Sequence, residues 1–349
     1  MNKTEGTIYI VSEIDVISNH KSDYYKCGIV RDGSDRDSRD RLLEHQTGNP
    51  RQLYIVDSFK TPFVEPVETA THYRFAKNRV KGEWLKLDKV ELERLKVSIS
   101  ELITEVKAHA SDFELADLLK KQPSNGKTLA LNTDAEFWYV EYKNFKAVQD
   151  SCDEVLEDYD NFLHTAIKKG IDVSPMAKIQ KRSAPKVFDE KLFSTLYPEL
   201  HKKYTTSTAE VKGSFRLSPD KNWVPDISTI GTEHIAIIAD LKESLKIVDH
   251  SIDYGFILHE KHLAVLEIQK YAQWKCDIAN IKLRVLTGDS DGIEGICSWK
   301  RKETIKNTFD KYQLQIDYPE EYQSCVTDGK ETEALIVQPM HAGKVDHSA

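Results

Sequence analysis

The sequence predicts an α+β protein: a small mixed unit near the amino terminus, followed by long helices and two repeated helix/β modules. Three observations support this fold class. Short β-rich apolar runs are concentrated before residue 88, long helical patterns dominate the remainder, and two sequence elements recur at a constant offset of 121 residues. Each is a periodic or repeated pattern, the most direct sequence signal of secondary structure and architecture.

Length and composition limit the class of protein. A chain of 349 residues is long for one hydrophobic core, so two or three domains are expected. No apolar run reaches the roughly 18 residues of a membrane span. The start, MNKTEGTIYIV, lacks the apolar stretch of a signal peptide. We therefore expect a cytoplasmic protein with no membrane contact.

Cysteine spacing and charge narrow the function classes. The five cysteines are scattered, odd in number and never in a CxxC pair, which favours free thiols and indicates no zinc site. The net charge of −8 argues against nucleic-acid binding, which needs local positive potential. Basic residues nevertheless cluster locally, at Lys178, Lys181, Arg182 and Lys186 and again at Lys300, Arg301 and Lys302. The overall charge therefore weakens a DNA-binding interpretation without excluding it.

The first 88 residues read as a compact α/β unit. Residues 7–12 and 24–30 predict two strands that could form a hairpin, and residues 52–58 predict a third. Between them, residues 40–46 predict a short helix that stops at Gly48 and Pro50. Pro66 suits the first turn of a further helix running to about Asn78, and GEWLKL at 82–87 predicts a closing strand.

Long helices and a repeat organise the rest of the chain. Asp88 and Glu91 have the spacing of a capping box and predict a helix start, and residues 135–169 and 258–286 carry further helical patterns. Phe188-Asp189 recurs as Phe309-Asp310, and the Tyr-Pro-Glu at 197–199 recurs at 318–320. Identical order and spacing favour duplication over chance. We predict a domain over 1–88, a helical connector and linker over 89–134, a helix with the first module over 135–220, a connecting segment over 221–257, a helix with the second module over 258–338, and a tail over 339–349.

Residue types alone supply candidates for chemistry. Glu68 and His72 lie four apart on a predicted helix and share one face, where they could hold a divalent cation or move protons. An exposed helical pair is the plainer interpretation. Arg41 opens a short helix and could hold phosphate, although most such arginines are simply on the surface. Tyr9 in a strand usually packs, and Gly28 marks either close backbone approach or a bulge.

The order of these segments resembles the GIY-YIG nuclease family, specifically its phage-associated branch, over about residues 5–88. The resemblance is carried by TIYIV, YKCGIV, RLLEHQTGNP, ETATHYRF and KGEWLKL, in that order. QTGNP after the arginine helix and the Gly-Glu-Trp of the closing strand are its most specific parts. The chain departs from the family where Thr7 replaces a glycine, and in a long acidic loop between Gly28 and Arg41.

The resemblance implies roles for particular residues. Tyr9 stands at the tyrosine of the first motif, and Lys26 where the second motif has its tyrosine. Arg41 corresponds to the catalytic arginine, Glu68 to the metal-binding glutamate, and His72 to a histidine frequent in this branch. The implied chemistry is DNA cleavage with one Mg²⁺ or Mn²⁺ held by Glu68, where the cation offsets phosphate charge and Arg41 stabilises the transition state. Tyr9, or a water it orients, would deliver the nucleophile.

A weaker resemblance covers the carboxy-terminal half. FDEKLFSTLYPELHKKY and SWKRKETIKNTFDKYQLQIDYPEEY are similar to the tail region of phage YqaJ-type exonucleases, without a carboxylate and lysine core of that nuclease. It implies DNA gripping or protein contact. We expect Lys300, Arg301 and Lys302 to bind DNA, and Trp299 either to meet a base or, as the plainer interpretation, to be buried.

Two function classes therefore follow from the sequence. The first is a metal-dependent DNA endonuclease whose carboxy-terminal modules position DNA or a partner. The second is a non-catalytic DNA-binding or assembly protein that carries a retired nuclease domain. The intact set of Tyr9, Arg41 and Glu68 favours the first class. The helical modules also offer surface for a protein partner or a second copy of the chain.

Overall fold

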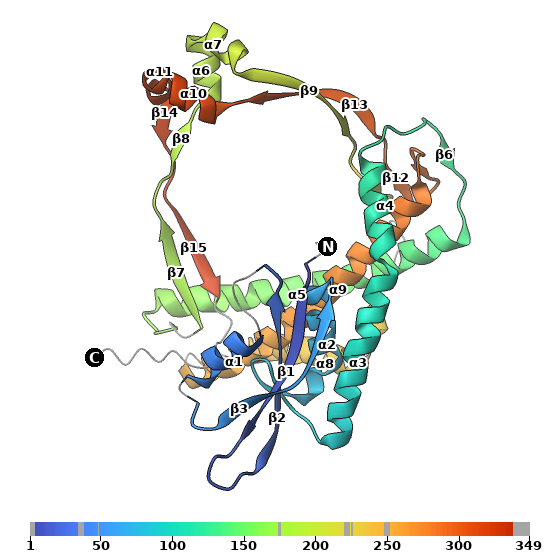
Figure 1. Cartoon of the computed structure of the whole chain (residues 1–349), viewed down its shortest axis with the longest axis vertical. Coiled ribbons are helices and arrows are strands. Elements are labelled where there is room, and N and C mark those ends of the chain that lie inside the picture. Colours follow the sequence, from blue (N-terminus) through green and yellow to red (C-terminus); the bar gives the residue numbers. More distant parts are fainter. Residues whose placement is uncertain are drawn as a thin grey trace.

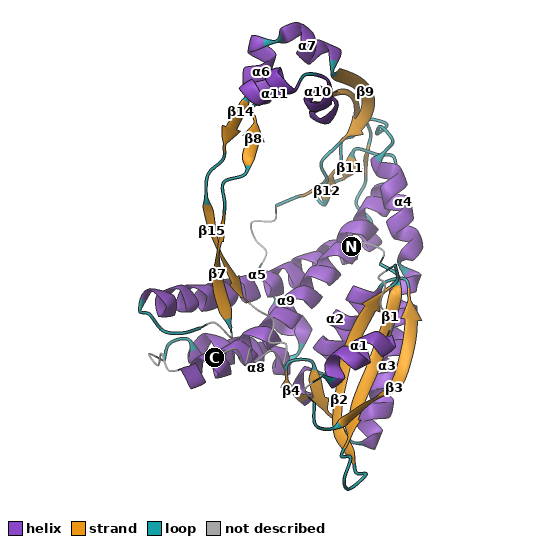
Figure 2. Ribbon diagram, turned by 60° about the vertical axis from the view of Figure 1, so that its left-hand side comes forward, coloured by secondary structure: helices purple, strands orange, loops and turns teal. Residues whose placement is uncertain are grey.

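The structure is a computed structural model that describes residues 4–33, 38–47, 49–173, 176–219, 224, 226–247 and 252–337. Gly48, part of the acidic loop before Arg41, part of the connecting segment over 221–257 and the tail over 339–349 lie outside the described residues. The α+β fold class is confirmed: an amino-terminal sheet unit, a base of long helices, and an arch of β-ribbons (Figures 1 and 2).

The amino-terminal unit is built on a five-stranded antiparallel sheet of order β3-β1-β2-β5-β4. Its strands are β1 (Gly6–Ile14), β2 (Lys21–Arg31), β3 (Gln52–Thr61), β4 (Arg79–Lys81) and β5 (Trp84–Lys86), and its helices are α1 (Ser38–Gln46), α2 (Val64–Arg74) and the 3₁₀ turn η1 (Ala76–Asn78). The predicted hairpin and third strand are confirmed. The three-residue strand β4 was not predicted, because it is too short to show alternation.

Alternation along β1 separates two apolar layers. Ile8 and Ile10 point into a core that α2 and α3 (Lys89–Ala108) complete, whereas Tyr9 and Val11 point to the opposite face, where Leu42 of α1 covers them. Beyond Lys26, β5 no longer pairs with β2. This end of the sheet, between the α1 face and the α2 face, is where the candidate catalytic side chains lie.

Two antiparallel helices of 36 residues each, α5 (Thr133–Lys168) and α9 (Ile252–Thr287), form the base. Hydrogen bonds between side chains join Gln149 to Gln273 at 2.7 Å and Gln269 to Asp153 at 3.0 Å, which fixes their opposite directions. Three shorter helical segments accompany them: α4 (Ala110–Lys120), η2 (Ile227–Ile230) and α8 (Thr232–Ser244). At Asp88 the predicted capping box is confirmed, since both of its hydrogen bonds form.

An arch rises from the base on the side away from the amino-terminal sheet (Figures 1 and 2). Arm 1 pairs β7 (Ala177–Arg182) with β15 (Thr332–Val337) and β8 (Lys186–Phe188) with β14 (Val326–Asp328). Arm 2 pairs β9 (Thr205–Lys212) with β13 (Lys302–Phe309), and β10 (Arg216–Leu217) with β12 (Cys297–Ser298), beside β11 (Gly292–Ile293) and β6 (Thr128–Leu129). The arms meet at a cap of α6 (Glu190–Leu196), α7 (Pro198–Lys203), α10 (Lys311–Asp317) and α11 (Pro319–Ser324).

The two sequence modules adopt the same local structure, as predicted. Asp189 caps α6 by accepting from the Leu192 amide at 2.9 Å, and Asp310 caps α10 by accepting from the Gln313 amide at the same distance. Pro198 and Pro319 each begin the second helix of their copy. Phe188 and Phe309 both line the cap's apolar cluster.

The copies are not separate modules, because each strand of one pairs with a strand of the other. Phe188 pairs with Val326, and Thr205 pairs with Phe309. Moving the first residue of the Phe188–Val326 pair forward by 121 and the second back by 121 gives the Phe309–Thr205 pair. The same operation turns the Ala177–Val337 pair of arm 1 into the Ser298–Arg216 pair of arm 2. The arch and its helical base therefore have an internal pseudo-two-fold axis.

Among the described residues, no helix is both long enough and apolar enough to cross a membrane. The five cysteines are all buried and free.

Candidate active site

Tyr9 lies in the middle of β1 and is only 1% exposed. Its partners across the sheet are Gly28 in β2 and Ser58 in β3. A Cβ atom on Gly28 would lie 2.6 Å from the Tyr9 hydroxyl and 2.8 Å from Cζ, so the phenol rests directly on the glycine. Of the two sequence interpretations of Gly28, close approach is the one observed, and any larger residue would displace the hydroxyl.

Helix α1 places two side chains over Tyr9. The positive charge of Arg41 acts on the Tyr9 hydroxyl, and Arg41 also forms an ion pair with Glu44 at 2.7 Å. His45, one helical turn later, has Nε2 at 3.4 Å from the same hydroxyl. Burial, with Lys26 and Arg41 nearby, lowers the pKa of His45 to about 4. The imidazole is therefore neutral at physiological pH and can accept a proton.

The Tyr9 phenol is itself a weak acid in this setting. Burial raises the pKa of Tyr9 to about 12, although the positive charge of Arg41 acts in the opposite direction. The hydroxyl is consequently protonated at neutral pH. Its reactivity depends on a neighbouring acceptor, and His45 is such a group.

Lys26 and Glu83 form an ion pair of 3.1 Å where β5 begins. The Lys26 side chain is largely buried, at 12% exposure, and that of Glu83 is half-exposed. The backbone before Glu83 is fastened to α9, since the Gly82 amide donates to Glu260 at 3.2 Å. Lys26, which stands where the resembled family has a tyrosine, is thus held in place by charge rather than left mobile.

Glu68 extends from α2 toward the same end of the sheet. The residue is half-buried, and the partial burial of its carboxyl group raises the pKa of Glu68 to about 8. The negative charges of Glu83 and of Glu267 on α9 raise the pKa further, while Lys270 and Arg31 oppose them. Within the described residues the carboxyl group forms no hydrogen bond or ion pair.

His72 lies one turn beyond Glu68 and is 6% exposed. Burial lowers the pKa of His72, and among the described residues its Nε2 atom has no hydrogen-bond partner. The side chain is therefore a neutral, buried imidazole close to Glu267 and Glu83. It can support Glu68 but does not reach Tyr9 by any contact in the described structure.

The donor set fits one hard divalent cation held mainly by substrate and water. Among the described residues there is no cluster of three or more His, Cys, Asp or Glu arranged to hold a metal. Mg²⁺ often binds through one or two carboxylates and completes its shell with water and phosphate oxygens. The Glu68 carboxyl, with the negative charge of Glu83 acting on it, meets that requirement, because a bound cation would offset the negative charges that raise the pKa of Glu68.

The predicted DNA contact of Arg301 is wrong. Arg301 is 1% exposed, and its guanidinium donates to the carbonyls of Leu119 at 2.9 Å and Gly288 at 2.7 Å. The guanidinium carbon also lies 3.9 Å from the centroid of the Trp299 ring. Trp299 is buried, which was the plainer of the two interpretations of its sequence position. Arg301 therefore ties the foot of arm 2 to α4 and to the end of α9. Lys300 and Lys302 remain exposed.

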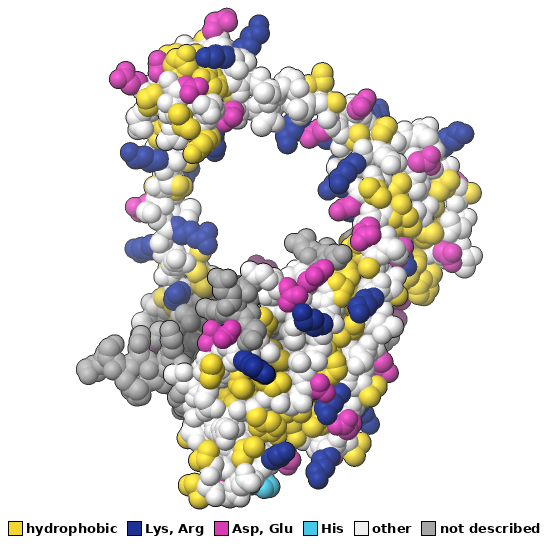
Figure 3. Space-filling view, in the orientation of Figure 1, with side chains coloured by type: hydrophobic (Ala, Val, Ile, Leu, Met, Phe, Trp, Pro, Cys, Tyr) yellow, Lys and Arg dark blue, Asp and Glu magenta, His cyan; other side chains and the backbone are white. Residues whose placement is uncertain are grey.

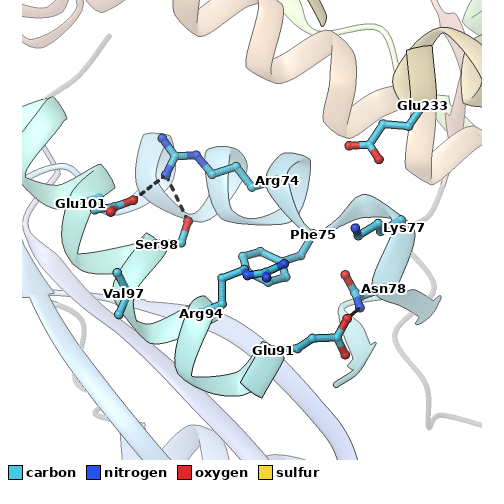
Figure 4. A pocket seen from close by; sticks show the side chains of 10 residues that line it. All are labelled: Arg74, Phe75, Lys77, Asn78, Glu91, Arg94, Val97, Ser98, Glu101 and Glu233. Atoms are coloured by element: carbon cyan, nitrogen blue, oxygen red, sulfur yellow. Dashed lines mark hydrogen bonds and ion pairs between the residues drawn. The ribbon is translucent and has the colours of Figure 1, made fainter. Parts of the chain in front are cut away.

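Two cavities lie elsewhere and contain none of the candidate catalytic residues. One, of about 310 Å³, lies between α2 and α3, where Arg74 pairs with Glu101 at 3.5 Å and donates to Ser98 at 3.1 Å (Figure 4). Another, of about 430 Å³, lies along α5 beside Leu217 and Pro219.

Two residues of the site were not identified from the sequence. His45 follows Arg41 by four residues on a predicted helix, and that spacing could have revealed it. Glu83 belongs to the Gly-Glu-Trp segment, but only the fold shows that its charge acts on Tyr9, His45, Glu68 and His72.

The charges of Arg41 and Glu68 thus act on Tyr9, and that of Lys26 acts on His45 beside it, whereas His72 is a buried residue one turn beyond Glu68. Comparison with known proteins adds no family to this picture: no protein-family model, curated protein or solved structure matches the chain.

Proposed function

We propose that the amino-terminal unit is a DNA endonuclease that hydrolyses phosphodiester bonds with the help of Mg²⁺ or Mn²⁺. One observation carries the proposal: the buried Tyr9 hydroxyl has the neutral imidazole of His45 at 3.4 Å, and the charges of Arg41 and Glu68 both act on it. Phosphodiester hydrolysis needs groups of these kinds, which bind negative charge, move a proton and hold a cation.

Each residue has a role that its surroundings suit. Arg41 faces the position of the Tyr9 hydroxyl and would stabilise negative charge on a phosphate placed there. Neutral His45 would accept a hydrogen bond from the Tyr9 hydroxyl and so orient it. The ion pair between Lys26 and Glu83 would hold the Glu83 carboxylate near the site. A cation at Glu68, when bound, would supply positive charge for the leaving oxygen.

Cleavage of supercoiled plasmid, with Mg²⁺, with Mn²⁺ and with a chelator, tests the proposal. We expect nicking with either metal ion and its loss in Glu68→Ala. A matched control is Glu93→Ala, since Glu93 is an exposed glutamate on α3, outside the arch. Undiminished nicking by Glu68→Ala would remove Glu68 from the mechanism. Absence of cleavage by the wild-type protein, together with intact DNA binding, would instead support a retired nuclease domain in a binding protein.

A further inference from the structure

The arch and its base enclose an opening that passes through the molecule. The opening remains when side chains are drawn, and Lys and Arg side chains lie along both arms (Figure 3). Arm 1 comprises residues 177–188 and 326–337, and arm 2 comprises residues 205–217 and 297–309. The arms are two-stranded ribbons with little cover: every residue from Lys302 to Thr308 is exposed. Because an isolated hairpin is marginally stable in water, these ribbons depend on the cap and base that hold their ends.

The arms are basic although the chain is acidic. Together they have eleven Lys and Arg against five Asp and Glu, in a protein of net charge −8. In arm 1, Lys181 faces Glu333 and pairs with it at 3.3 Å. At the equivalent place in arm 2, Lys302 faces Lys212, and like charges directly opposite one another destabilise a ribbon. Glu210 forms ion pairs there with Lys212 at 2.7 Å and with Lys306 at 3.8 Å. This surplus charge favours a polyanion as partner.

The pseudo-two-fold axis crosses the opening from base to cap. At the cap it passes between the rings of Phe188 and Phe309. At the base, two hydrogen bonds join α5 to α9, from Gln149 to Gln273 and from Gln269 to Asp153. Residues related by the offset of 121 lie opposite one another between these two bonds. The axis therefore passes between the midpoints of α5 and α9. A duplex that passes through the opening has its own dyad axes perpendicular to its length. The symmetry of the ring therefore matches a duplex better than a single strand or a globular protein.

The spacing of the arms is adequate for a duplex. Met176, at the foot of arm 1, contacts Gly255 of α9, and Phe215, at the foot of arm 2, contacts Arg284 of α9. These 29 helical residues separate the feet by roughly 44 Å at about 1.5 Å per residue. Side chains on each ribbon extend about 5 Å, half the spacing of stacked sheets. The remaining width exceeds that of a B-form duplex.

We propose that the arch encircles double-stranded DNA. This inference rests on the proposed function for the identity of the nucleic acid, but not for any chemical step. The exposed lysines of the arms contact phosphates on both strands, and the ribbons present a shape that fits the major groove. Since the same chain runs through both arms and the cap, a duplex inside is retained by topology as well as by charge.

A retention assay tests encirclement. Labelled protein in chelator is loaded at low salt onto a linear duplex with biotinylated ends, half of the sample then receives streptavidin, and both halves are challenged with high salt. Charge contacts weaken in salt, so an encircling protein leaves only by sliding off an end. We expect a half-life at least tenfold longer on the blocked duplex. Equal half-lives would overturn the proposal.

Arm variants form the second part of the test. Lys178→Glu/Arg182→Glu/Lys186→Glu should reduce low-salt affinity for duplex at least tenfold. The matched triple Lys89→Glu/Lys107→Glu/Lys120→Glu, on α3 and α4, should change it much less. Circular dichroism verifies that both fold. Equal losses would overturn a specific role for the arms. Retention without cleavage would support encirclement and oppose the nuclease, and cleavage without retention would do the reverse.

Discussion

The rings of Phe188 and Phe309 stack with centroids 5.9 Å apart and an interplanar angle of 11°, although 121 residues separate them in the chain. Each residue ends the strand that enters its pair of cap helices, and each is followed by the aspartate that caps the first of them. The contact joins equivalent positions of two copies across their common axis. An internal duplication thus closes on itself as a two-fold dimer would, within one polypeptide.

Equivalent caps should have equivalent energies. Asp189→Ala and Asp310→Ala each remove one side-chain hydrogen bond to a helix amide, and each should destabilise the protein by about 1 kcal/mol. Urea unfolding followed by circular dichroism measures both. A loss confined to one variant would show that the copies contribute unequally to stability.

Glu68→Gln should stabilise the metal-free protein at high pH. The folded-state pKa of Glu68 is about 8, above the usual 4.5, so the folded state binds more protons than the unfolded state between these values. Wild-type stability therefore falls as pH rises from about 4.5 through 8, and the variant escapes this fall. We expect a gain of about 1–3 kcal/mol at pH 9 and none at pH 4, from thermal unfolding in chelator. The exposed control Glu331→Gln should follow the wild-type profile.

Arg41→Ala should lower the single-turnover cleavage rate by about 100-fold or more while DNA affinity falls only modestly. Charge that develops in the transition state is stabilised more strongly by a fixed donor than the charge of the bound substrate. Cleavage at saturating DNA gives the rate, and fluorescence anisotropy in chelator gives the affinity. Equal losses in rate and affinity would make Arg41 a phosphate anchor only.

Gly28→Ala should reduce cleavage strongly while leaving the fold in place. The added methyl group would occupy the position of the Tyr9 hydroxyl and push the phenol away from His45 and Arg41. Cleavage assays and circular dichroism separate activity from folding. Full activity of Gly28→Ala would argue against a catalytic position for Tyr9.

Arg301 and its two lysine neighbours should respond differently to substitution. Arg301→Ala should destabilise the protein by about 3 kcal/mol or more, because it leaves buried carbonyls without donors. Lys300→Glu/Lys302→Glu should leave stability nearly unchanged, weaken DNA binding and reduce the steepness of its salt dependence. Binding isotherms at several salt concentrations test this, and an unchanged affinity would assign arm 2 to protein contact.

Local patterns in the sequence predicted the local structure well. The hairpin of β1 and β2 and the capping box at Asp88 each depend on residues close together in the chain. The offset of 121 predicted two copies of one element. It could not predict that the copies exchange strands, because pairing between β9 and β13 depends on contacts across the whole second half of the chain.

The candidate site was predictable only in part, for the same reason. Tyr9, Arg41 and Glu68 were found through motif order, whereas the influence of Glu83 and Glu267 on Glu68 arises from tertiary placement. Arg301 shows the converse. Its neighbours Lys300 and Lys302 made it look like part of an exposed basic run, but burial against Trp299 gives it a structural role.

The chain passes twice through each arm, and this determines the order in which the arms can form during synthesis at the ribosome. Strand β9 is made early but has no partner until β13 follows, and strand β7 waits for β15, which ends at Val337. Domains fold from the amino terminus as synthesis proceeds, so the sheet of the amino-terminal unit can form while each arm still has only one of its two strands. The opening comes into being only after β15 has been synthesised, so a shorter nascent chain has no closed ring through which DNA could pass.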